Sequence, residues 1–155
     1  PGQIDAGVVL YLMAEKGWDP KSVEHFLYHE CGLKGLSGIS SDVRELLASP
    51  QPEAALALAY FAHKIAQLAA GIAVTMGGLD GFIFTAGIGE DAPAIRAAVA
   101  EKLGFLGMAI DPERNAVRGT TVIGADDSRV QTLVVPTDEE LMIARHALVL
   151  LRGGA

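Results

Sequence analysis

The chain has 155 residues, of which 50% are hydrophobic and 20% are charged, and its formal net charge is −7. This length suits one globular domain that buries its own core. The acidic balance, without any cluster of Lys and Arg, argues against nucleic acid as a partner, because such binding depends on neutralising phosphates. Cys31 is the only cysteine. No internal disulfide can form, which fits a reducing compartment such as the cytoplasm.

Helices are predicted for the first part of the chain. Apolar residues near helical spacing indicate a helix over 5–16. Asp19 and Pro20 mark the start of a second helix, as N-cap and first helical residue, and this helix is expected to run to about Cys31. A loop rich in Gly and Ser is expected over 34–41.

A long apolar helix is predicted after a short helix over 42–48. It begins at Pro52 and ends before Gly77. Its length could suit a membrane span, but His63 and Lys64 lie in its middle, where a charge is costly in hydrocarbon. We therefore expect a largely buried helix of a soluble fold, or a helix at a subunit interface, and no membrane partner.

The second half changes to strands that alternate with helices, which predicts an α/β fold. The expected elements are a strand over 79–85, a tight loop over 87–89, a helix over 92–103, an irregular stretch over 104–115, strands over 120–123 and 129–135, and a helix capped by Thr137 or Asp138. Three strands are few for a full sheet, and the sequence begins at Pro1 rather than at a methionine. We therefore expect part of a longer protein.

A Gly-rich segment over 85–91, between a strand and a helix, is the first candidate site. Glycines at the end of a strand let the backbone approach a ligand, and the amides of the next helix favour an anion. A nucleotide or phosphate ester and a simple packing turn are about equally supported. The segment is not a Walker loop, because no Gly-Lys-Ser/Thr follows. Glu90 and Asp91 argue against a bare phosphate seated on these amides.

Two further segments combine polar side chains with a helix start. Over 40–44, the simple interpretation is that Ser41 caps a short helix and Asp42 complements its dipole. Over 136–140, a carboxylate could hold Mg²⁺ through water, although acids are also common where a helix begins.

His25 and His29 lie four residues apart, a spacing at which two histidines can share a zinc ion. A zinc-protease helix needs Glu directly after the first His, and Phe26 stands there instead. A solvated or packing face is the favoured interpretation. Cys31 is expected to be structural or incidental, since nothing beside it in sequence would lower the pKa of its thiol.

Taken together, several segments resemble the acetate kinase family. The segment over 84–90 resembles its FTAGIGE signature, 38–44 its GISSDxR segment, and 135–141 its (I/V)PTNEEL segment. The stretches 104–107 and 110–111 also fit the connecting region. The match covers essentially the whole chain in order, so it is more specific than any one motif.

The resemblance implies a fold, a site and a substrate. The fold would be a partial ribonuclease-H-like, actin-like ATPase lobe, helix-rich with a small sheet, in which 1–155 form the C-terminal nucleotide-binding lobe. The family usually has Asn where this chain has Asp91 and Asp138, and Asp91 adds charge near the nucleotide. The implied site residues are Asp42, Val43 and Arg44 on the adenosine side, Gly87, Ile88, Gly89, Glu90 and Asp91 around ribose and phosphates, and Glu139 beside Mg²⁺.

The family's other active-site groups precede this region in sequence, so the resemblance implies no catalytic residue within the chain. These groups are an Asn/Ser/Lys phosphate loop, a catalytic Asp, a transition-state His and two Arg residues. A piece without them is expected to be inactive, because phosphoryl transfer depends on cations that neutralise developing charge. The helix after Asp138 would also lack the lobe on which it packs.

The implied partners are ATP or ADP, acetate or another short carboxylate held by the preceding lobe, and a second copy in a cytoplasmic homodimer. Two alternatives stay open. A propionate or butyrate kinase is the close enzymatic one, and a non-catalytic dimerisation or nucleotide-binding module is the other.

Overall fold

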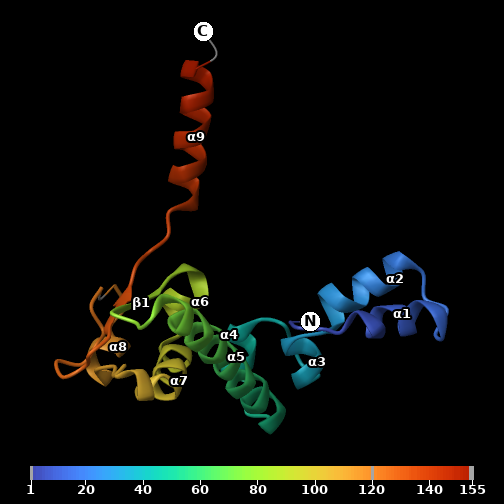
Figure 1. The fold of residues 1–155 in the computed structure, drawn as a ribbon, viewed down its shortest axis with the longest axis horizontal. Helices are drawn as coiled ribbons and strands as arrows, with labels where there is room; N and C mark the ends of the chain where they lie inside the picture. Colours follow the sequence, from blue (N-terminus) through green and yellow to red (C-terminus); the bar gives the residue numbers. More distant parts are fainter. Residues whose placement is uncertain (1, 120, 154–155) are drawn as a thin grey trace. The chain divides into compact units, whose positions relative to one another are not determined.

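The computed structural model describes residues 2–119 and 121–153 (Figure 1). The chain forms two compact units, Pro1–Ala69 and Ala70–Ala155. Helix α5 (Pro52–Met76) runs across the boundary between them.

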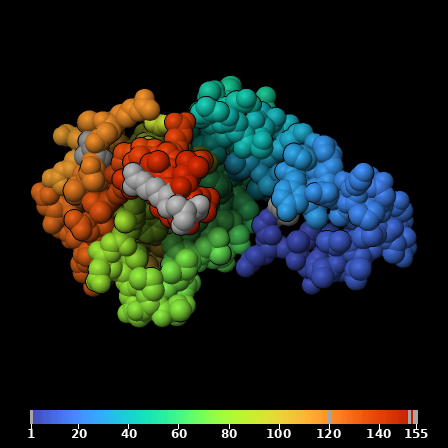
Figure 2. Space-filling view, turned by 90° about the horizontal axis from the view of Figure 1, so that it is seen from above, coloured from blue at the N-terminus to red at the C-terminus, as the bar shows by residue number. Residues whose placement is uncertain are grey.

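Unit 1 consists of helices, as predicted. They are α1 (Ala6–Ala14), α2 (Pro20–His25), a π-helical turn η1 (Phe26–Glu30), α3 (Leu33–Ser37), α4 (Val43–Ala48) and the first part of α5. Asp5 and Asp19 cap α1 and α2 by accepting hydrogen bonds from the amides of Gly7 and Ser22 at 2.7 and 2.9 Å. The two helices lie against one another (blue in Figures 1 and 2).

Three expectations for unit 1 are corrected. The second helix has the predicted extent, but its last turn is π-helical. The expected loop over 34–41 begins as helix α3, which ends where Gly38 adopts φ 66°. The cap of α4 is Asp42, not Ser41, because the Asp42 carboxylate accepts from the Arg44 amide at 2.8 Å.

A small apolar cluster holds α4 against the start of α5. Leu46 is 1% exposed, and it packs with Ala54 and Ala57. Alanine leaves room for the helices to approach closely, so the cluster depends on the larger side chain of Leu46 to fill the contact.

Helix α5 is long and apolar enough to cross a membrane by length and composition, but it is not largely buried as expected. Its buried positions are all alanines, namely Ala54, Ala57, Ala62, Ala66 and Ala73. Its larger apolar side chains, such as Leu56 and Ile72, are exposed. The length test is weak support for a membrane span, because core helices of soluble proteins also pass it.

Unit 2 is built on two parallel strands, as an α/β pattern predicts. Its elements are β1 (Gly81–Phe84), α6 (Ala86–Asp91), α7 (Pro93–Lys102), a 3₁₀ turn η2 (Gly104–Leu106), α8 (Pro112–Ala116), β2 (Gln131–Val134) and α9 (Glu139–Gly153). Gly81 pairs with Gln131, and Phe84 with Val134. Val99 of α7 and Leu103, the C-cap residue of that helix, are fully buried. Unit 2 thus combines a two-stranded parallel sheet with several helices.

Three expectations for unit 2 are also corrected. The predicted tight loop over 87–89 is the helix α6, which begins abruptly because Ala86 takes φ 59°. The stretch over 104–115 contains η2 and α8, which Asp111 caps. Of the expected strand over 120–123, Thr120 lies outside the described residues.

The described part of that expected strand, residues 121–123, forms an isolated β-bridge and not a continuous strand. Val122 pairs with Leu133 of β2 in antiparallel orientation. The amides of Ile123 and Gly124 both donate to the Thr132 carbonyl, at 2.9 and 3.1 Å. Two residues opposite one form a bulge, which interrupts the ladder.

Helix α9 begins as predicted, with Asp138 accepting a hydrogen bond from the Leu141 amide at 2.8 Å. Every side chain of α9 that the structure describes is exposed. The exposed apolar side chains are Leu141, Met142, Ile143, Leu148, Val149, Leu150 and Leu151.

The cluster around Leu46 can be tested by truncation. We expect Leu46→Ala to lower the free energy of unfolding by about 2–5 kcal/mol, because the cavity cannot be filled by neighbouring alanines. Leu47, which is 41% exposed, is the matched control, and Leu47→Ala should change the free energy by about 0.5 kcal/mol or less. Urea unfolding followed by circular dichroism measures both, and equal losses would contradict the assigned core.

Candidate functional site

The two parallel strands bring two of the predicted segments together. Because β1 and β2 run in the same direction, the residues that follow them emerge at the same edge of the sheet. The Thr85 hydroxyl donates to the Val135 carbonyl at 2.8 Å, and the Val135 amide donates to the Phe84 carbonyl at 2.9 Å. The Gly-rich segment and the segment over 135–139 therefore start side by side.

Glu90 joins these two segments again at the other end of α6. Its Oε1 accepts a hydrogen bond from the Thr137 amide at 3.0 Å and one from the Thr137 hydroxyl at 3.2 Å. These bonds fix the chain just before α9. Of the predicted nucleotide residues, Glu90 is thus the one whose carboxylate bridges the two segments.

Arg96 supports α6 from beneath. It is only 3% exposed, and its Nη1 donates to the carbonyls of Gly89 and Glu90, both at 2.8 Å. Its Nε and Nη2 donate to the side chain and carbonyl of Asn115 at 2.7 and 2.6 Å. Burial lowers the pKa of Arg96, an effect that the charge of Asp91 opposes. These oxygens compensate the buried Arg96 cation, and the hydrogen bonds in turn fix the backbone carbonyls of Gly89, Glu90 and Asn115.

The two glycines of α6 have different surroundings. A Cβ on Gly89 would lie 3.1 Å from the carbonyl carbon of Phe84, so Gly89 permits the helix to start close to β1. A Cβ on Gly87 would meet nothing within 4 Å. Gly89 is therefore needed by the fold, whereas Gly87 leaves open surface beside the helix.

A cavity of roughly 150 Å³ lies at this edge of unit 2. Its lining residues are Glu90, Asp91, Arg118, Gly119, Val134 and Pro136. Two of these residues form an ion pair, with Arg118 Nη2 3.1 Å from Asp91 Oδ1. The cavity is therefore lined by both predicted segments and by an arginine that sequence reasoning did not select.

The other predicted nucleotide residues belong to unit 1. Hydrogen bonds from the Arg44 side chain and amide lower the pKa of Asp42 to about 2. Asp42 therefore stays ionised at neutral pH and acts as a hydrogen-bond acceptor. Val43 is buried, with 4% of the residue exposed.

Glu139, the predicted Mg²⁺ residue, is exposed at the start of α9, two residues after Thr137. Within residues 2–119 and 121–153, no group of three His, Cys, Asp or Glu could hold a metal ion. A single carboxylate still fits Mg²⁺, which keeps several waters and is shared with substrate phosphates. Glu139 therefore suits a Mg²⁺ bound together with a phosphorylated ligand.

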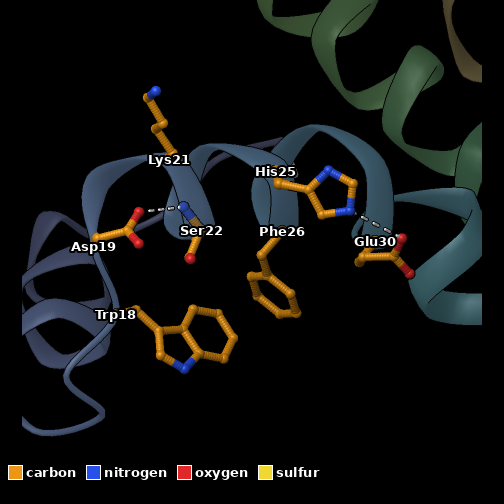
Figure 3. Close-up of a pocket in the computed structure, with 7 residues that line it drawn as sticks. All are labelled: Trp18, Asp19, Lys21, Ser22, His25, Phe26 and Glu30. Carbon is orange, nitrogen blue, oxygen red and sulfur yellow. Dashed lines mark hydrogen bonds and ion pairs between the residues drawn. The ribbon is translucent and has the colours of Figure 1, made fainter.

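A second cavity, of roughly 510 Å³, lies beside α2 in unit 1 (Figure 3). The rings of Trp18 and Phe26 meet edge to face with centroids 5.2 Å apart. The polar groups around it already have local partners, since Asp19 caps α2 and Glu30 pairs with His25 at 3.7 Å. Ligand sites more often show polar groups that converge on the cavity.

The candidate zinc pair also lies in unit 1. The rings of His25 and His29 are 4.9 Å apart and tilted by 36°. This arrangement resembles a stacked pair of rings.

Comparisons with known proteins agree on one family. A model of the Acetokinase family matches residues 1–145. The acetate kinase of Nitrobacter hamburgensis is 54% identical over 97% of this chain and 37% of its own length. The crystal structure of Porphyromonas gingivalis acetate kinase matches with a TM-score of 0.84 and 34% identity, over 97% of this chain and 39% of that one.

A propionate kinase from Francisella tularensis matches with a TM-score of 0.82 and 35% identity, over 92% of this chain and 37% of that one. The chain thus spans between 37% and 39% of the length of these three proteins. It corresponds to a part of such kinases, as the sequence led us to expect.

The two glycines of α6 give a paired test of the local packing. We expect Gly89→Ala to lower the free energy of unfolding by about 1–3 kcal/mol, because the added methyl meets the backbone of Phe84. Gly87→Ala should be neutral or stabilising by up to about 1 kcal/mol, since open space surrounds a helical position. Thermal unfolding of both variants decides this, and a tolerant Gly89 would contradict the close approach.

Proposed function

Because the chain belongs to the Acetokinase family, we propose that it forms the nucleotide-binding part of an acetate kinase, which converts ATP and acetate to ADP and acetyl phosphate. The observation that carries this proposal is the pair of hydrogen bonds from Thr137 to Glu90. They tie two segments that are 47 residues apart into one edge of a parallel sheet, where open α/β folds bind ligands.

In this proposal, each segment contacts a different part of the nucleotide. Gly87, Ile88, Gly89, Glu90 and Asp91 surround the ribose and phosphates, and Asp42, Val43 and Arg44 lie on the adenosine side. The open space around Gly87 supports a close approach of the ligand to the backbone. The carboxylates of this edge suit the ribose hydroxyls as hydrogen-bond acceptors.

Glu139 would hold Mg²⁺ through water at the start of α9. Bound there, the ion would neutralise phosphate charge as phosphoryl transfer proceeds. The part of this chain in that step is to bind and orient the nucleotide.

The residues of the described edge do not complete the chemistry. Phosphoryl transfer requires cations around the transferring group. Arg96 is buried and already donates to carbonyls, and Arg118 is paired with Asp91. The chain therefore supplies one wall of the site. Acetate is bound by groups outside this chain, and the enzyme is a cytoplasmic homodimer.

A propionate kinase is the second candidate, supported by the TM-score of 0.82 to the Francisella tularensis enzyme. The two differ in the acid that receives the phosphoryl group. A butyrate kinase falls in the same class. Turnover of the corresponding longer polypeptide with acetate, propionate and butyrate distinguishes the three, and absence of turnover with any acid would favour a non-catalytic module.

The 155-residue chain alone should bind Mg-ADP weakly and transfer no phosphoryl group. Titration calorimetry measures the binding, and a coupled assay with ATP and acetate measures turnover. Turnover at an ordinary kinase rate, on the order of 1–100 s⁻¹, would contradict the proposal that the cations lie elsewhere. Failure to bind ADP at millimolar concentration would contradict the nucleotide site itself.

Gly87→Val tests the assigned role of α6. The added side chain enters open space, so the variant should fold, yet it should weaken ADP binding by at least about tenfold, or ~1.4 kcal/mol. Gly104→Val is the matched control, because a Cβ on Gly104 also meets nothing within 4 Å and Gly104 lies outside the proposed site. Equal ADP affinity in folded Gly87→Val and wild type would remove α6 from the site.

A further inference from the structure

Arg118 and Asp91 form an ion pair beside the cavity, and stabilisation of the fold does not explain why a pair lies there. The side chains are 87% and 51% exposed, so the pair is solvated. Exposed pairs of this kind contribute little to folding. The pair nevertheless lies on the rim of the 150 Å³ cavity that the two predicted segments share.

The electrostatics of this rim oppose a phosphorylated ligand. Asp91 is the last residue of α6, and it lines the cavity together with Glu90. The neighbouring carboxylate of Glu90 is held in place by Thr137. A nucleotide whose phosphates approach α6 therefore meets two adjacent carboxylates, which repel it most where water is partly displaced.

Arg118 is the only cation among the described residues that line this cavity. Arg96 also lies beneath α6, but it is buried, and its donors are occupied by the carbonyls of Gly89, Glu90 and Asn115. Among the described residues that line the cavity, Arg118 is therefore the one that neutralises the negative charge of Asp91.

We propose that Arg118 is a positioning residue for the phosphates of the nucleotide, and that it acts through Asp91. By neutralising Asp91 it allows a nucleoside diphosphate or triphosphate to lie beside α6. It has little influence on the uncharged adenosine moiety. This inference rests on the proposed nucleotide site. It adds that the negative charge of Asp91 must be neutralised before phosphates can lie there.

A double-mutant cycle in the full 155-residue chain tests the inference. The variants are Arg118→Gln, Asp91→Asn and the double variant, with Arg118→Lys as the charge-conserving control. Binding of Mg-ADP and of adenosine is followed by NMR titration. Circular dichroism and thermal unfolding check the fold, which should be unaffected because both side chains are exposed.

We expect Arg118→Gln to weaken ADP binding by about fivefold to tenfold, because an uncompensated carboxylate then faces the phosphates. Arg118→Lys should retain affinity within about twofold. Asp91→Asn is the reference background against which the double variant is compared. In the Asp91→Asn background, Arg118→Gln should have almost no further effect. Adenosine binding should be the same in all variants, a result that a merely structural role of Arg118 would not produce.

Two results overturn the inference while leaving the nucleotide site intact. One is wild-type ADP affinity in Arg118→Gln. The other is an equal loss in the presence and absence of Asp91, which would mean that Arg118 contacts the phosphates directly. If wild-type protein binds neither ADP nor adenosine, the proposed function itself fails, and the inference fails with it.

Discussion

The parallel pairing of β1 with β2 is the constraint on which the candidate site depends. It places the residues after both strands at one edge, so that Thr85 reaches the Val135 carbonyl and Glu90 reaches Thr137. With antiparallel strands the same segments would leave from opposite ends of the sheet. The pairing thus converts two sequence motifs into one surface, although the strands themselves are only four residues long.

Arg96 shows how such a small sheet can support an ordered helix beside it. A buried guanidinium is costly unless its donors are satisfied, and here four oxygens satisfy them without a partner carboxylate. The same hydrogen bonds hold the carbonyls at the end of α6. The Arg96 cation therefore orders the backbone at the end of α6, while Arg118 pairs with Asp91 beside the cavity.

Local signals accounted for most helices, because their causes lie within a few residues. Asp19 with Pro20 and Asp138 with its following acids begin helices where expected. Local signals were wrong where geometry beyond the segment decided the outcome. The Gly87–Gly89 stretch became helical because Gly89 can pack against Phe84 and Ala86 adopts an unusual φ. Similarly, the converging amides of Ile123 and Gly124 shortened an expected strand.

The sequence alone determined the family, the order of the main elements and the segments from which a nucleotide site would be built. These depend on residue types at fixed spacing, which sequence records directly. Only the tertiary structure decided that Glu90 bonds Thr137 and that Arg96 holds α6 through Asn115. It also decided that Arg118 faces Asp91, a pairing across 27 positions that no local pattern contains. Contacts between distant positions arise from how the strands and helices pack, and a linear pattern does not encode them one by one.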